Sequence, residues 1–103
     1  MCNAYILHYL PQFEHDLKAV RDYIAFTLRN PDAANQLVED AEKAILKRLD
    51  NPLIFQPYPS AKKRDYPYYR INVRNFSIFY VVIENVMEVR RFVYSKRNLP
   101  KII

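Results

Sequence analysis

The sequence predicts an α+β fold with the element order βααβββ, in which a helical hairpin packs on one face of a small, mainly antiparallel four-stranded sheet. Three observations predict this fold. Apolar residues recur at steps of three and four in two neighbouring blocks between residues 13 and 49, as amphipathic helices require. Three β-prone runs separated by short turns follow residue 68. One more β-prone run, residues 4–9, precedes the helices.

Two helices account for the apolar blocks. The first is expected to begin at Pro11, because proline is favoured in the first turn of a helix. Asn30 suits the N-cap of the second helix, with Pro31 in its first turn. The first apolar stripe consists of Phe13, Leu17, Val20, Ile24 and Leu28, and the second of Ala34, Leu37, Val38, Ala41, Ile45 and Leu49. So short a link between two amphipathic helices predicts an antiparallel hairpin.

Residues 52–67 contain four prolines and are expected to form a loop. Strands are expected at residues 69–74, 76–83 and 86–94, and the middle run is apolar on both faces, as in a strand covered on both sides. The chain has no glycine. Asn75 and Asn85 are therefore expected to take the positive φ angles of the two turns, which asparagine tolerates better than other residues do.

The totals fit one globular domain over residues 1–103. Hydrophobic residues are 50% and charged residues 26% of the chain, which is typical of a folded protein rather than a disordered one. No apolar run is long enough to span a bilayer, and the N-terminus does not resemble a signal peptide. The single Cys2 suits the cytoplasm. His8 and His15 are interpreted as surface or strand-end residues, so we expect neither a metal site nor a cofactor, and no membrane partner.

Positive charge is concentrated in the C-terminal part of the chain. Residues 60–103 carry ten basic and three acidic residues, a net charge of +7, whereas residues 1–59 carry six basic and eight acidic residues, a net charge of −2. This asymmetry indicates an anionic partner, either nucleic acid, an acidic protein or both. The alternative is a solvated basic face that maintains solubility.

Polar and apolar residues alternate along residues 69–74. Ile71 and Val73 are expected to face the helices, which places Arg70, Asn72 and Arg74 in one row on the opposite face of the sheet. Tyr68 is expected to extend this row, and Arg90 or Arg91, Lys96 and Arg97 to border it. Arginines gathered on one sheet face form a phosphate-binding surface, because the guanidinium fork matches phosphate geometry.

Over nearly its whole length the sequence resembles the toxins of the RelE/ParE superfamily of bacterial type II toxin–antitoxin systems. Three segments carry the resemblance: "DLKAVRDYIAFTLRNPDAANQLVEDAEKAILKRLDNP", "YYRINVRNFSIFYVVIENVMEVRRFVY" and "VYSKRN". The resemblance implies a microbial-RNase-like fold and a cognate antitoxin protein as partner. It also implies one of two activities, since RelE-like members cut mRNA in the ribosomal A site without a metal, and ParE-like members poison DNA gyrase.

The RelE-like chemistry can be carried over residue by residue. Arg70 matches the first cation of the family's strand, Arg97 matches a late arginine, and Tyr94 replaces a frequent histidine; the resemblance makes these three the expected catalytic residues. Two positions depart from the family, because Asn72 stands where a lysine is common and Ser77 where an arginine is. The expected substrate-binding residues are Arg74, Asn72, Lys96 and Arg90.

Cleavage of RNA by its 2′-hydroxyl needs a proton acceptor, and arginine is a poor one because it stays protonated. Tyr94, Glu88 or Asp65 would have to accept the proton, although each also fits a structural role, as a sheet-edge aromatic, a cross-strand partner of arginine and a loop salt bridge respectively. We place ribosome-dependent mRNA cleavage first among the activities. The alternatives are a ParE-like inhibitor of DNA gyrase and a non-catalytic basic protein-binding module.

Overall fold

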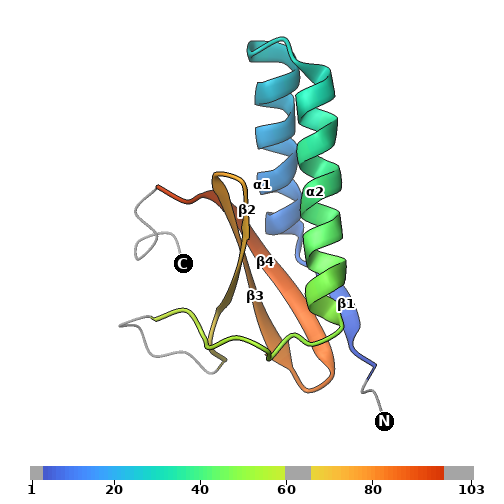
Figure 1. Cartoon of the computed structure of the whole chain (residues 1–103), viewed down its shortest axis with the longest axis vertical. Helices are drawn as coiled ribbons and strands as arrows, with labels where there is room; N and C mark the ends of the chain where they lie inside the picture. Colours follow the sequence, from blue (N-terminus) through green and yellow to red (C-terminus); the bar gives the residue numbers. More distant parts are fainter. Residues whose placement is uncertain (1–3, 60–65, 97–103) are drawn as a thin grey trace.

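A helical hairpin and a four-stranded sheet form the two layers of the computed structural model (Figure 1), which describes residues 4–59 and 66–96. The elements follow the predicted order. They are β1 (Ile6–Tyr9), α1 (Pro11–Asp22), a π-helical turn η1 (Tyr23–Thr27), α2 (Pro31–Leu49), β2 (Tyr69–Val73), β3 (Phe76–Ile83) and β4 (Val86–Tyr94). The predicted α+β fold is confirmed, and the expected strand boundaries differ from the observed ones by two residues or fewer.

The sheet has the strand order β1-β4-β3-β2 and is mainly antiparallel, as predicted. β2 pairs with β3 and β3 with β4 in antiparallel fashion, whereas β1 runs parallel to β4, with Tyr9 opposite Val89. The β3–β4 register shifts between Phe79, which faces Arg91, and Tyr80, which faces Val89. Arg90 is therefore the extra residue of a β-bulge.

The helices begin where their first residues predict. Pro11 and Pro31 occupy the first turns of α1 and α2, where the missing N–H of proline costs no hydrogen bond. The side-chain oxygen of Asn30 accepts a hydrogen bond from the backbone N–H of Ala33 at 3.1 Å, so Asn30 is the N-cap of α2.

The hairpin extends beyond the sheet, and its tip carries η1 (Figure 1). Arg29 ends this helical run with a φ angle of 53°, and the N–H of Asn30 donates to the carbonyl of Ile24. A residue in the left-handed conformation commonly ends a helix. The tip leaves large apolar side chains in solvent, with Phe26 74% and Leu28 55% exposed.

The main core lies between the helices and one face of the sheet. Phe13, Leu37, Ala41 and Ile45 of the helices pack against the buried strand residues Ile71, Val73, Ile78, Tyr80, Met87, Val89 and Phe92. A smaller cluster lies on the other face, which we call the open face. There Phe79 and Val93 are buried beneath Tyr58 and Tyr68. β3 is thus covered on both sides, as its apolar sequence predicts.

The prediction for the turn residues is wrong. Positive φ angles belong to Arg74 (54°) and Glu84 (56°), the first residues of the two turns, and not to Asn75 and Asn85, the second ones. In both turns the first residue takes the left-handed conformation. The position of this conformation within the turn therefore overrides the greater tolerance of asparagine for positive φ angles.

Candidate functional site

Arg70 lies on the open face, as predicted. Its Nε donates a hydrogen bond to Oγ of Ser77 at 2.9 Å, across the β2–β3 pair. Ser77 is fully buried, and its Oγ lies 2.8 Å from Oγ of Ser95, just beyond β4. The position where the superfamily often has an arginine therefore holds a neutral anchor for Arg70. Asn72 is exposed and lies opposite Ser77 in the register.

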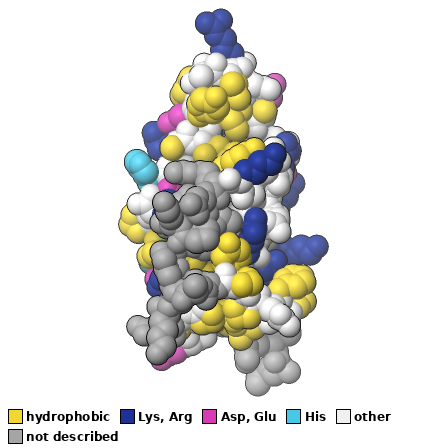
Figure 2. Space-filling view, turned by 90° about the vertical axis from the view of Figure 1, so that its left-hand side faces the viewer, with side chains coloured by type: hydrophobic (Ala, Val, Ile, Leu, Met, Phe, Trp, Pro, Cys, Tyr) yellow, Lys and Arg dark blue, Asp and Glu magenta, His cyan; other side chains and the backbone are white. Residues whose placement is uncertain are grey.

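An aromatic ring lies beside each of two arginines on this face. The guanidinium carbon of Arg70 lies 5.7 Å from the ring centre of Tyr58, and that of Arg90 lies 5.8 Å from the ring centre of Tyr68. Arg90 also forms a 2.8 Å ion pair with Glu88. Burial lowers the pKa of Arg90, but hydrogen bonds to Tyr68 and Glu88 outweigh this effect and leave the pKa raised. Figure 2 shows this side of the molecule, where Lys and Arg side chains lie beside apolar ones.

Arg74 departs from the predicted row. It lies in the β2–β3 turn, and its Nη2 forms a 2.7 Å ion pair with Oδ2 of Asp40 on α2. Hydrogen bonds from Gln36 and then from Arg74 lower the pKa of Asp40. The expected row of Arg70, Asn72 and Arg74 is therefore wrong in its last member, because the left-handed turn directs Arg74 toward the helical hairpin.

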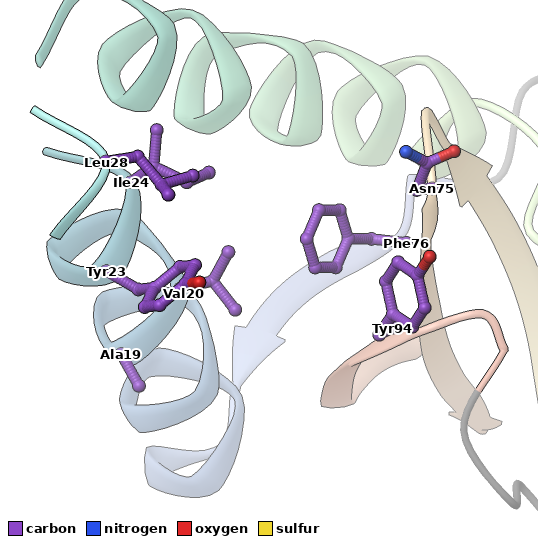
Figure 3. A pocket seen from close by; sticks show the side chains of 8 residues that line it. All are labelled: Ala19, Val20, Tyr23, Ile24, Leu28, Asn75, Phe76 and Tyr94. Carbon is purple, nitrogen blue, oxygen red and sulfur yellow. The ribbon is translucent and has the colours of Figure 1, made fainter. Parts of the chain in front are cut away.

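Tyr94 lies on the helix side of the sheet. Its ring makes an edge contact with Phe76, at 5.8 Å between ring centres, and the two residues face each other in the register. Both line an apolar groove between the hairpin and the end of β4 (Figure 3). The groove has a volume of about 450 Å³ and is lined by Ala19, Val20, Tyr23, Ile24, Leu28, Asn75, Phe76 and Tyr94. Tyr94 and Arg70 thus lie on opposite faces of the sheet.

This groove is not among the features predicted from the sequence. The available signal was the first apolar stripe, because its last members, Ile24 in η1 and Leu28 directly after it, line the groove.

The remaining predicted site residues are distributed as follows. Lys96 is exposed and directly follows Ser95. Glu88, a candidate proton acceptor, is paired with Arg90. Arg97, expected to be catalytic, and Asp65, the other candidate acceptor, lie outside the described residues.

In residues 4–59 and 66–96, no group of three or more His, Cys, Asp or Glu side chains could hold a metal ion. In the same part of the chain, no helix has the length and apolar character needed to cross a membrane.

Comparison with known structures supports the fold. The chain is similar to a chain of the chromosomal ParDE toxin–antitoxin system from P. aeruginosa, with a TM-score of 0.74 and 17% identity over 91% of this chain and 99% of that one. It is also similar to a chain of the E. coli DinJ–YafQ toxin–antitoxin complex, with a TM-score of 0.55 and 12% identity over 88% of this chain and 92% of that one. Identities this low show a shared fold only.

Sequence comparison identifies the family. No curated protein matches the sequence significantly. Residues 7–99, however, match the family model described as "ParE toxin of type II toxin-antitoxin system, parDE". The match includes all seven helical and strand elements except the first residue of β1. The chain therefore belongs to the ParE toxin family of type II toxin–antitoxin systems.

Proposed function

We propose that this toxin inhibits DNA gyrase, the activity that the resemblance attributes to ParE-like members. The observation that carries the proposal is the position of Tyr94, which lies on the face of the sheet opposite Arg70. RelE-like cleavage would need both side chains at one phosphodiester, because the proton acceptor and the cation act on the same group. Gyrase inhibition makes no such demand.

Glu88, the other candidate proton acceptor in the described residues, also favours gyrase inhibition over mRNA cleavage. Both Nε and Nη2 of Arg90 lie 2.8 Å from the same oxygen of Glu88. This oxygen already accepts two charge-assisted hydrogen bonds, so a substrate hydroxyl would have to compete with the guanidinium group for it. The match to the ParE family model supports the same choice.

We further propose a cognate antitoxin as partner, acting in the cytoplasm where gyrase works. Both structures compared above come from toxin–antitoxin assemblies. The proposed antitoxin has an acidic segment that is disordered alone and folds across the sheet and the hairpin, with apolar side chains in the groove beside Tyr94. The charge of +7 in residues 60–103 and the apolar lining of the groove support this chemistry.

The test is to express the chain alone in a bacterium and to supply the purified chain to gyrase. We expect an SOS response and DNA breaks in the cell, and loss of negative supercoiling by gyrase in the purified reaction. Translation arrest with cuts in mRNA, together with unaffected gyrase, would establish the RelE-like activity instead. Coexpression of the protein encoded next to the toxin gene should abolish either effect if that protein is the antitoxin.

A further inference from the structure

Neutral side chains hold one cation of the open face in a fixed orientation. Nε of Arg70 donates to the buried Ser77, which contacts Ser95, and the guanidinium group lies over the ring of Tyr58. None of these groups is a carboxylate. The orientation of Arg70 is therefore established without neutralising its charge.

The other arginines in residues 66–96 are paired with acids. Arg74 pairs with Asp40, Arg90 with Glu88 and Arg91 with Asp16. Within the described residues, the two terminal nitrogens of Arg70 have neither a hydrogen-bond partner nor an ion-pair partner. Arg70 therefore keeps its full charge and the paired donors that suit an oxyanion.

The surroundings of Arg70 favour an extended anion. Asn72, two residues further along β2, is exposed and has amide donors, and the exposed Lys96 adds a second cation next to Ser95. An arginine whose orientation is already fixed loses less conformational entropy when it binds a ligand. Phosphate groups are the ligands that match a fixed guanidinium fork.

We propose that Arg70 binds a backbone phosphate of duplex DNA, namely the DNA that gyrase holds while the toxin acts on it; this inference rests on the proposed function. Duplex DNA suits the face better than single-stranded RNA, because sequence-tolerant binding of single strands uses exposed aromatic rings on which bases stack. Here the rings of Tyr58 and Tyr68 pack against Phe79, with 5.2 and 6.2 Å between ring centres. The open face thus presents positive charge and amide donors, which suit the phosphate backbone of a duplex.

The first experiment measures binding of the purified full chain to a labelled DNA duplex between about 50 and 200 mM salt. Loss of one phosphate contact should reduce the log–log salt slope by about 0.9, so we expect this change in Arg70→Ala. Arg70→Lys keeps the charge but not the fork, and we expect weaker binding with the parental slope. The control is Lys47→Ala, which removes one exposed charge from α2 and should leave the slope unchanged. Equal slopes in the parent and Arg70→Ala would overturn the proposal.

Two further arms separate the remaining outcomes. If Arg70→Ala changes the salt slope for single-stranded RNA but not for the duplex, the assignment to DNA is overturned. The second arm measures gyrase supercoiling. If the parent does not inhibit gyrase but Arg70→Ala still shows the flatter slope on DNA, the proposed function fails and the phosphate site stands. If the parent inhibits gyrase and the slopes are equal, the function stands and the site fails.

Discussion

Asp16 of α1 accepts a hydrogen bond from Nε of Arg91 at 2.8 Å and another from the backbone N–H of Phe92 at 3.1 Å. Both donors lie where the bulge at Arg90 shifts the register of β4, beyond the segment of that strand that β1 covers. One carboxylate, only 10% exposed, therefore serves a cation and a backbone donor at the edge of the sheet. It also fixes the first helix against the last strand.

Removing this carboxylate should destabilise the fold. We expect Asp16→Ala to cost about 2–4 kcal/mol, because it removes the acceptor that a partly buried guanidinium and an edge N–H share. Asp16→Asn should cost less, since its amide oxygen can still accept from Phe92. Urea unfolding measures both, with Glu14→Gln as the control, because Glu14 is exposed on the same helix and loses the same charge. Equal stability of Asp16→Ala and the control would contradict the role assigned to Asp16.

Tyr80 connects the sheet to the end of the hairpin. Its hydroxyl donates to the carbonyl of Pro52 at 2.6 Å and accepts from Nη1 of Arg48 at 3.0 Å. Tyr80 is fully buried. We expect Tyr80→Phe to lose about 1–3 kcal/mol of unfolding free energy at neutral pH, because it leaves the buried acceptor on Pro52 unpaired.

The same variant should respond differently to alkaline pH. Burial raises the pKa of Tyr80 above its ordinary value of 10.0, and the hydrogen bond from Arg48 offsets only part of this effect. Above about pH 10 the unfolded chain releases this proton while the folded chain keeps it, so the stability of the parent falls as pH rises. Phenylalanine has no proton to release, and the stability gap between parent and variant should narrow. Unfolding curves at neutral and alkaline pH measure this gap, and a constant gap would count against the assignment.

The spacing of apolar residues predicted the fold well, because burial of apolar faces decides where the helices and strands lie. Ile71 and Val73 face the core as their alternation requires, and Asn30 caps α2 as its position before Pro31 indicates. The candidate site was less predictable. The bulge places Arg90 and Arg91 between Val89 and Phe92, which both face the main core, and the turn at Arg74 redirects that side chain toward Asp40. The turn leaves no trace in the apolar pattern. The bulge leaves only the step of three residues between Val89 and Phe92, where regular alternation requires two.

Glycine at position 84 should stabilise the turn between β3 and β4. Glu84 has a φ angle of 56°, which a residue with a Cβ atom adopts only at a cost. We expect Glu84→Gly to stabilise the fold by about 0.5–1 kcal/mol, after the greater freedom of glycine in the unfolded chain is subtracted. Asn85→Gly is the matched control, because its position has no positive φ angle and the change should be neutral or destabilising. Thermal unfolding separates the two, and a loss of stability in Glu84→Gly would show that the turn imposes no such cost.

The apolar groove supplies the last prediction, which concerns the proposed antitoxin. Leu28 lines the groove and is 55% exposed, so a charged side chain at this position should cost the free toxin little stability. In a complex the same charge would be buried against apolar partners without a counter-ion. We therefore expect Leu28→Asp to weaken antitoxin binding by roughly tenfold or more.

Leu46→Asp is the control for this change. Leu46 is 54% exposed on α2 and does not line the groove, so the substitution matches the first in chemistry and exposure. Titration calorimetry with the antitoxin gives both affinities, and thermal midpoints verify that each variant is folded. In cells, Leu28→Asp should resist rescue by the antitoxin, whereas Leu46→Asp should be rescued like the parent. If both variants bind the antitoxin as tightly as the parent, the antitoxin does not use this groove, and its apolar anchor must be sought elsewhere on the hairpin or on the open face.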